Sequence, residues 1–552
     1  MSSSVSRELR TELEPELLRG VPLDVVLSSW ARHFRPPDPG MFQVDHANYD
    51  LSKQLDYYDE FLSHDWETSR WYKLCTMMMI YNSRAAFWCT CFASIAVGIL
   101  SALKILPNEL WTQLSVLAVY PLVLCFWQRI RSIFARPMMV FLDKLCIAQH
   151  DEELKQKGIF GLAGFLDHSR QLTIFWSHRY FSRLWCTYEV GTFLRDKKQK
   201  PILVIPVKLA VIFSIFSLAE LLIMGGYFAS ASLTLETEST ENEFQQLISF
   251  LLFFSIFYAP ALPVLFFLGI GMMSDLTDLP RQLREFRVQD AKCFCCSNQH
   301  RHPDTGETLP CDRELMFHTL KKWFGKEEDL HDEHLETFNQ LVHKDLAPQV
   351  LQSVASDVLP FSYSMYMVVV SCFPGLCSLI PRLVEGPPDT SGAILQHTIW
   401  VCREIMAWIF PGVVVLYALR LSTRFWLIAV RLSPKGSPDL RHRLFYSLLM
   451  PIPMSCMLAS QWFSFQLALS QSEHDSLLPA IPFLAWVLLL YCIWTWGTPV
   501  ATKTPTELGS NVATSVVVQQ VTLLKEEVLA TESVDPIILE TDEVDTVSTF
   551  ST

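Results

Sequence analysis

The chain has 552 residues, of which 50% are hydrophobic and only 18% are charged, and its formal net charge is −13. Soluble domains usually carry about a quarter charged residues, so this composition argues against an ordinary soluble protein. The acidic balance argues against nucleic acid as a partner. The apolar residues gather in long runs, and a helix needs about 20 of them to cross a bilayer.

The runs predict an α-helical polytopic membrane protein with about eight spans. Buried core helices of a large soluble protein are the alternative, but too many runs exceed about 18 residues for that reading. The predicted spans are Ala85–Leu106, Leu110–Trp127, Val207–Phe228, Leu247–Met273, Leu359–Leu383, Ile399–Leu421, Phe445–Leu469 and Leu477–Gly497.

The distribution of Lys and Arg predicts the orientation. With eight spans and a cytoplasmic N-terminus, the outer loops Ala229–Gln246, Glu385–His397 and Ser470–Ser476 contain no Lys or Arg. The loop Arg424–Arg443, which then lies inside, holds five. Positive residues favour the cytoplasmic side, so both termini are expected in the cytoplasm. The lipid bilayer is the first predicted partner.

Soluble and apolar segments alternate along the chain. A soluble lead (1–56) precedes the first part of an α/β domain (57–84). A transmembrane hairpin (85–127) separates it from the second part (128–206). Two further spans (207–273), a cytoplasmic loop rich in Cys and His (274–358) and four more spans (359–497) follow. The end (498–552) reads as a disordered acidic tail, with a helix expected around Val516–Ala530.

The two soluble parts predict one parallel sheet of about four strands. Short apolar runs alternate with helical patterns at Thr68–Tyr81 and Gly158–Ser169, which is typical of a doubly wound α/β fold. Ser182 is a candidate N-cap for a further helix that runs to about Asp196. The predicted strands are Tyr58–Leu62, Met138–Leu142, Leu172–Trp176 and Pro201–Val207.

Polar residues follow these strands, where ligands bind in such sheets. On the last predicted helix Trp185 and Glu189 are four residues apart and are expected to share a face. A carboxylate and a ring at strand ends suit a sugar and a flat base. The alternative is a packed helix with Glu189 paired to a basic neighbour. The strand-end candidates are Ser63, His64, Asp65, Asp143, Lys144 and Ser177.

Four segments resemble Toll/interleukin receptor (TIR) domains in order and spacing. YDEFLSHDW at Tyr58–Trp66 looks like the first family box, and VFLDKLCIAQHDEELKQKGI at Val140–Ile159 looks like the second strand and its following loop. FLDHSRQLTIFWSHRYFSRLWCTYEV at Phe165–Val190 resembles the family's tryptophan-cysteine-x-x-glutamate segment. PILVIPV at Pro201–Val207 resembles the next strand. Together these segments cover about a fifth of the chain.

The resemblance implies a flavodoxin-like signalling domain that acts by TIR–TIR association or by cleaving NAD at its nicotinamide–ribose bond. The family's catalytic glutamate corresponds to Glu189, and its first box, which lines the nucleotide site, to Ser63, His64 and Asp65. Asp143 and Lys144 open its mobile loop. A carboxylate can stabilise or trap the ribose cation that forms, as in glycoside hydrolysis. The chain departs from the family in its inserted membrane hairpin and in entering the membrane at Val207.

The cytoplasmic loop 274–358 contains a second group of functional candidates. Cys293 and Cys296 have the C-x-x-C spacing of a zinc knuckle, and His300 or His302 with Cys311 would complete a tetrahedral site. Cytosolic thiols stay reduced, which disfavours disulfides. S-palmitoylation near the membrane and plain structural thiols remain alternatives to zinc.

Charged residues also occur inside the predicted spans, at Glu220, Arg403 and Glu404. Such charges are costly and often functional. A transporter or channel with a TIR-like regulatory domain is therefore the alternative to a signalling protein, and a structural membrane scaffold is a third reading.

Overall fold

The computed structural model describes residues 13–35, 46–107, 110–195, 200–234, 241–301, 306, 308–325, 332–355, 358–387, 394–433, 438–472 and 476–495. The described part is mostly helical, with one small mixed sheet. The predicted tail, with its helix at Val516–Ala530, lies outside the described residues.

The sheet has six strands in the described part of the chain. Their order is β2-β1-β4-β3-β5-β6, in which β3, β4, β5 and β6 run parallel and β1 is antiparallel to both of its neighbours. The strands are β1 (Arg19–Pro22), β2 (Lys53–Gln54), β3 (Tyr58–His64), β4 (Met139–Phe141), β5 (Ser169–Trp176) and β6 (Ile202–Pro206).

The predicted pairing of the first two core strands is confirmed, because Glu60 pairs with Val140 and Phe61 with Phe141 in parallel register. The prediction of about four strands in a parallel sheet was too simple. β1 and β2 extend the sheet beyond β4 in antiparallel register. Both are short, and both residues of β2 are exposed, so they lack the apolar alternation that marks a strand in sequence.

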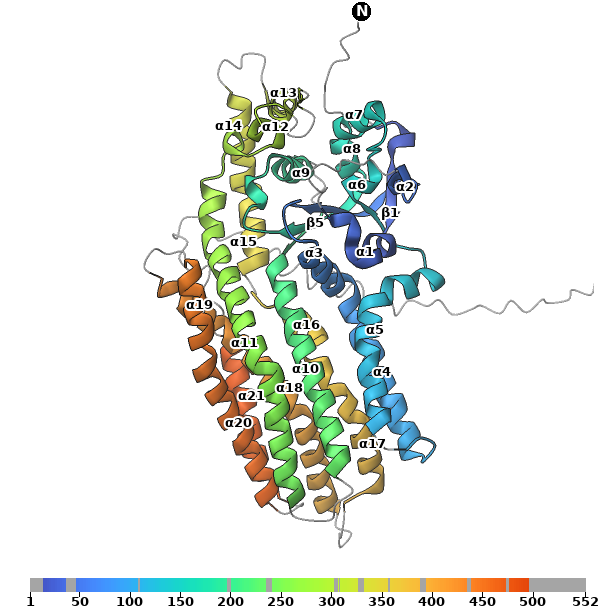
Figure 1. The fold of residues 1–552 in the computed structure, drawn as a ribbon, viewed down its shortest axis with the longest axis vertical. Coiled ribbons are helices and arrows are strands. Elements are labelled where there is room, and N and C mark those ends of the chain that lie inside the picture. Colours follow the sequence, from blue (N-terminus) through green and yellow to red (C-terminus); the bar gives the residue numbers. More distant parts are fainter. Residues whose placement is uncertain are drawn as a thin grey trace, which may run out of the picture. The chain divides into compact units, whose positions relative to one another are not determined.

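Two elements of the sheet domain pass directly into the helix bundle (Figure 1). Helix α3 (Arg70–Met77), which follows β3, continues through a π turn at Met78–Asn82 into α4 (Ser83–Ala102). Strand β6 ends at Pro206, and α10 (Val207–Thr234) begins at the next residue. Helix α3 also packs against α10. Along the chain, the hairpin of α4 and α5 (Leu110–Phe134) is inserted between β3 and β4, which pair with each other in the sheet. The hairpin and the sheet must therefore assemble together.

Six helical stretches in the described residues are long and apolar enough to cross a membrane. A seventh arises if the bent pair Phe361–Met367 and Val369–Glu385 counts as one span. The eighth predicted span forms a shorter apolar helix, α21 (Ala480–Thr495). The six are Arg70–Ala102, Trp111–Phe134, Val207–Gly226, Ala259–Arg284, Ile394–Arg431 and Leu440–Gln471.

The bundle is built from long helices. Helices α10, α11 (Glu241–Arg284) and α18 (Ile394–Arg431) run side by side (Figure 1). Buried side chains form a continuous apolar core from the sheet into these helices. The other bundle helices are α16 (Phe361–Met367), α17 (Leu376–Glu385), α19 (Leu440–Leu449) and α20 (Pro451–Gln471).

The remaining helices are short. The helix predicted to follow Ser182 begins at Leu184, so the predicted N-cap at Ser182 is wrong. The Ser182 hydroxyl donates instead to the Arg179 carbonyl (2.7 Å). The predicted helical pattern at Gly158–Ser169 spans parts of two helices, α7 and α8. The short helices are α1 (Leu23–Ala31), α2 (His46–Tyr49), α6 (Asp143–Cys146), α7 (Glu152–Phe160), α8 (Leu162–Asp167), α9 (Leu184–Arg195), α12 (Phe294–Ser297), α13 (Asp312–Phe324), α14 (Glu333–Leu341) and α15 (Ala347–Ala355).

Candidate functional site

A chain of three hydrogen-bonding groups lies at the carboxyl end of β3. The Ser63 hydroxyl is 2.5 Å from the Tyr180 hydroxyl and donates to Glu189 Oε2 at 2.5 Å. A hydroxyl has one proton, so when Ser63 donates to Glu189 it is Tyr180 that donates to Ser63. Ser63 comes from β3, Tyr180 from the turn after β5 and Glu189 from α9. With His64 and Lys73, they form what we call the strand-end cluster.

Burial sets the protonation of this cluster. Part of the Glu189 residue is exposed, but burial of its carboxyl raises the pKa to about 8, against a lowering by the Ser63 hydrogen bond. The negative charge of Asp143 raises it further. Burial also raises the pKa of Tyr180 well above its usual value, so this phenol remains a donor. Glu189 can therefore hold or release a proton near neutral pH.

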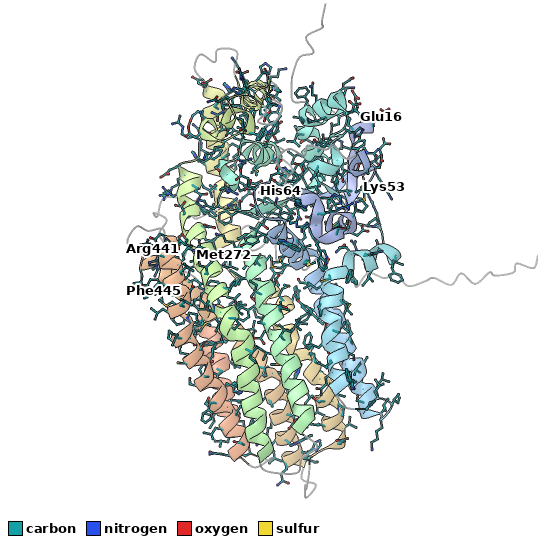
Figure 2. The ribbon with its side chains drawn as sticks, viewed as in Figure 1. Glu16, Lys53, His64, Met272, Arg441 and Phe445 are labelled. Carbon is teal, nitrogen blue, oxygen red and sulfur yellow. The ribbon has the colours of Figure 1, made fainter. Side chains whose placement is uncertain are left out.

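His64, which Figure 2 labels, and Lys73 are the other two members of the strand-end cluster. Both residues are buried. Burial and the nearby Lys73 charge lower the pKa of His64 well below its usual value, so the ring is neutral. The edge of Phe34 packs on this ring at 4.9 Å between centroids, and Trp66 lies 4.6 Å away. The Lys73 ammonium lies 5.4 Å from the ring centroids of both Phe34 and Trp66, without a hydrogen bond to any described residue. Aromatic rings thus occupy the space beside His64 and Lys73.

The other predicted polar residues after β3 and β4 have structural partners. Asp65 lies within ion-pair distance of Arg179 (3.5 Å) and Arg183 (3.8 Å). Asp143 accepts a hydrogen bond from the Trp66 indole at 2.9 Å, and burial raises its pKa. The Lys144 ammonium donates to the backbone carbonyl of Arg35 at 3.0 Å. These contacts hold the residues after both strands and part of the N-terminal segment around the cluster.

Trp185 lies apart from Glu189, although the two residues are four positions apart on α9. Its indole N–H donates to Asp312 Oδ2 at 3.2 Å, and its ring packs edge-on against Tyr188. The expected pairing of this ring with the carboxylate around one ligand is therefore absent from the described arrangement. Trp185 joins α9 to α13 instead.

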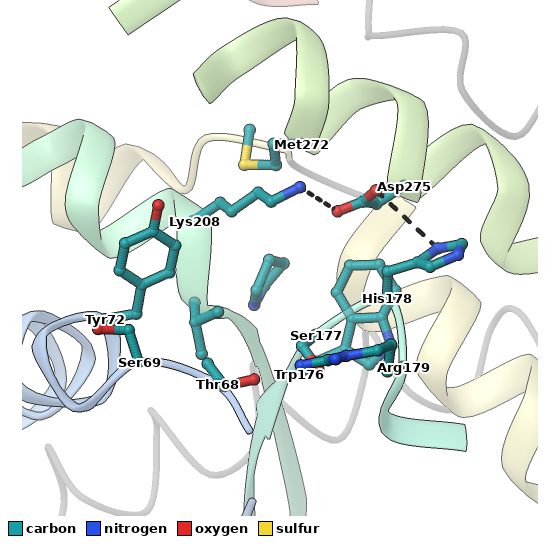
Figure 3. Close-up of a pocket in the computed structure, with 12 residues that line it drawn as sticks. Thr68, Ser69, Tyr72, Trp176, Ser177, His178, Arg179, Lys208, Met272 and Asp275 are labelled. Atoms are coloured by element: carbon teal, nitrogen blue, oxygen red, sulfur yellow. Dashed lines mark hydrogen bonds and ion pairs between the residues drawn. The ribbon is translucent and has the colours of Figure 1, made fainter. Parts of the chain in front are cut away.

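Ser177 lines a different space, a cavity of about 220 Å³ between the ends of β5 and β6 and the bundle (Figure 3). Across it Lys208 contacts Asp275 at 2.5 Å, and His178 lies 3.9 Å from the same carboxylate. The buried Ser177 hydroxyl makes no hydrogen bond to any described residue. The cavity lies where the sheet domain meets α10 and α11, and no residue of the strand-end cluster lines it.

The cysteine-rich loop forms a second cluster. Candidate ligand atoms of Cys295, Cys296, His300 and Cys311 all lie within 4.8 Å of one another; we call these four the thiol cluster. Three of the four were predicted. Cys293 lies beside the group, with its sulfur 3.5 Å from that of Cys295. His302 is outside the described residues.

Lys73 and Phe34 were missed as site residues by the sequence reasoning, and Tyr180 was named only as part of the family segment. A lysine within the amphipathic stretch Thr68–Tyr81 was the available signal for Lys73. Phe34 lies in the lead segment, far from the strands in sequence, and had no comparable signal.

No protein-family model, curated protein or solved structure matches this chain. The functional argument therefore rests on the geometry of the two clusters.

Proposed function

We propose that the chain is a membrane-embedded signalling protein whose cytoplasmic TIR-like domain cleaves NAD at the nicotinamide–ribose bond. The observation that carries this proposal is the hydrogen-bonded chain from Tyr180 through Ser63 to Glu189. It puts a carboxyl with a pKa of about 8 at the ends of parallel strands. The bias of Lys and Arg supports the cytoplasmic assignment.

The position of this chain in the sheet supports a ligand site. From β4 to β6 the strands follow the order of a flavodoxin-like sheet, in which the chain goes first to one side of β3 and then to the other. The switch point lies between β3 and β5, and ligands bind at the carboxyl ends of the strands there. Ser63 lies on β3 and Tyr180 follows β5, so the two sides of the switch point meet in one hydrogen bond.

The proposed chemistry uses the ionised form of Glu189. The glycosidic bond breaks with its electron pair going to the nicotinamide nitrogen, which neutralises the pyridinium and leaves a cationic ribose. The Glu189 carboxylate stabilises this cation or bonds to its anomeric carbon. Water then adds its oxygen to that carbon, displaces the carboxylate where a bond had formed, and releases a proton to solvent. Ser63 and Tyr180 orient the carboxylate. Because the carboxyl is largely protonated below about pH 8, the rate should rise with pH towards that value.

The test compares two glutamates of the same sheet domain. Purified full-length wild type at high protein concentration should consume NAD and release nicotinamide. The Glu189→Gln substitution should lower this rate by at least about 100-fold. Glu60→Gln is the matched control. Glu60 is buried in this domain and accepts hydrogen bonds from Tyr81 and Thr173 rather than from Ser63. Equal rates for wild type and Glu189→Gln would refute the enzyme proposal.

Association of TIR-like domains without catalysis is the second candidate. The packing of Phe34 and Trp66 on the His64 ring favours it, because these rings occupy the space beside one of the predicted nucleotide-site residues. This candidate would be supported if wild type consumed no NAD at any protein concentration, but formed larger cross-linked species as its concentration rose.

Transport or conduction has weaker support. The charges inside the bundle have structural partners: Arg403 donates to the Ser472 hydroxyl at 2.7 Å, and Glu404 pairs with Arg382 at 3.0 Å. These contacts suit charges that hold helix ends together.

A further inference from the structure

The geometry of the thiol cluster points to a metal site, and we propose that Cys295, Cys296, His300 and Cys311 bind one structural zinc ion. Zinc in structural sites takes four Cys or His ligands in a tetrahedron. This proposal is independent of NAD cleavage.

The distances between ligand atoms fit that tetrahedron. With zinc–sulfur bonds of about 2.3 Å, two sulfurs of a tetrahedral site lie about 3.8 Å apart, and a sulfur and an imidazole nitrogen about 3.6 Å apart. The Cys296 and Cys311 sulfurs are 3.8 Å apart, and the Cys296 sulfur is 3.5 Å from His300 Nε2. These two distances match a tetrahedral zinc site, and all four ligand atoms lie within 4.8 Å of one another.

The backbone of the loop brings the ligands together from two directions. The His300 N–H donates to the Cys295 carbonyl at 2.7 Å, and His300 itself has a left-handed φ of 57°. A non-glycine residue in this region is uncommon. It turns the chain back so that the His300 ring meets Cys296. A bridge between Arg301 and Thr308 then returns the chain to Cys311.

A backbone hydrogen bond also supports a thiolate at the centre. The N–H of Asp312 donates to the Cys295 sulfur at 3.3 Å. Amide donors of this kind stabilise the charged sulfur that binds a metal, in the way that outer hydrogen bonds tune metal ligands. Cys295 is buried, which makes it a poor target for acylation at the membrane surface.

The proposed ion would fasten α13 beside α9. Cys311 immediately precedes α13, whose first residue, Asp312, accepts the Trp185 hydrogen bond. A parallel bridge joins Arg183, just before α9, to Lys292. With four protein ligands the site has no open position, so the ion is structural rather than catalytic.

Metal analysis of the purified full chain tests the proposal. Wild type should contain about one zinc ion per molecule, as a closed four-ligand site requires. Cys295→Ser and Cys311→Ser should each lose it. Cys293→Ser is the matched control and should retain zinc, because Cys293 lies two positions from Cys295 but outside the four ligands. Metal-free wild type would overturn the site, and zinc lost from Cys293→Ser but kept in Cys295→Ser would overturn the ligand assignment.

A second measurement covers variants that fail to fold. Wild-type protein stripped with a chelator and refilled with Co²⁺ should show the visible absorption of a tetrahedral cobalt–thiolate centre. The Cys293→Ser protein should show the same spectrum. The absence of this absorption in cobalt-loaded wild type would contradict the proposal. A Cys296–Cys311 disulfide in the freshly purified protein under thiol-protecting conditions would contradict it as well.

Discussion

The two clusters that flank α9 are built in opposite ways. In the strand-end cluster, Ser63 hydrogen-bonds to both Tyr180 and Glu189, and the Phe34 ring packs on His64. In the thiol cluster four candidate ligand atoms lie within 4.8 Å of one another, and the contacts among them are weak ones between two sulfurs and between a sulfur and an imidazole. The comparison shows two ways to arrange a polar cluster. Hydrogen bonds bring oxygen atoms to 2.5 Å in the strand-end cluster, whereas two sulfurs of the thiol cluster lie 3.8 Å apart, as two ligands of one metal ion would.

The largest expected effect concerns the cover of the strand-end cluster. Phe34 is fully buried against His64 and Phe175. Phe34→Ala should lower the free energy of unfolding by about 3–5 kcal/mol, because it removes a large buried side chain and leaves a cavity. Denaturant unfolding of the full chain in detergent measures this loss.

Trp30 supplies the control for Phe34, since it lies in the same segment but is 52% exposed. Trp30→Ala should change stability by less than about 0.5 kcal/mol. Zinc content should be unchanged in both variants, because neither residue contacts the thiol cluster. Equal losses of stability in the two variants would mean that the buried Phe34 ring contributes no more to the free energy of unfolding than the exposed Trp30 ring.

The second effect is the pH dependence that Glu189 confers. Its pKa is about 8 in the folded protein and near 4.5 when unfolded. Between these values the unfolded chain releases the proton and the folded chain keeps it, so stability falls as pH rises. Allowing for partial exposure, the loss should be on the order of 2–3 kcal/mol between about pH 4.5 and 8.

Thermal unfolding of wild type and Glu189→Gln across this pH range measures the effect. The amide cannot ionise, so the stability of wild type relative to the variant should decrease with pH and level off above about 8. The stability difference between wild type and the variant could instead stay constant with pH, or grow in favour of wild type. Either result would contradict a raised pKa of the Glu189 carboxyl.

The sequence predicted the parts of this fold that depend on local pattern. Every predicted apolar span contains a helix or a bent helix pair of the structure, because a run of apolar residues needs no partner to be recognised. The pairing of β3 with β4 was also predictable, since both strands are short apolar runs with polar ends. β1 and β2 were missed because antiparallel additions at an edge depend on the neighbouring strand rather than on their own pattern.

The sites were predictable only in part. Sequence spacing indicated Ser63 and Glu189 but paired Glu189 with Trp185, because a shared helix face does not decide which neighbour each side chain meets. The C-x-x-C pattern likewise indicated Cys293, whereas the short helix α12 and the turn at His300 bring Cys295 into the group of four. Such choices depend on tertiary contacts, which spacing does not contain.

The smallest expected effect tests whether the two clusters influence each other through α9. Asp312→Ala removes the acceptor of the Trp185 indole and should cost about 1 kcal/mol in the free energy of unfolding. Glu314→Ala is the control: it removes another acidic residue from the first turn of α13, but Glu314 is exposed. Zinc content should be unchanged in both.

The informative comparison is the cost of Asp312→Ala with and without metal. If zinc holds α13 in place, the Trp185 hydrogen bond is well formed only in the metal-bound protein, and its loss should cost less after chelation. Unfolding of both proteins in both forms gives this coupling, expected at about 0.5–1 kcal/mol. A cost that is the same in both forms would mean that the clusters contact one helix but remain energetically independent, so that zinc would not bear on Glu189 at all.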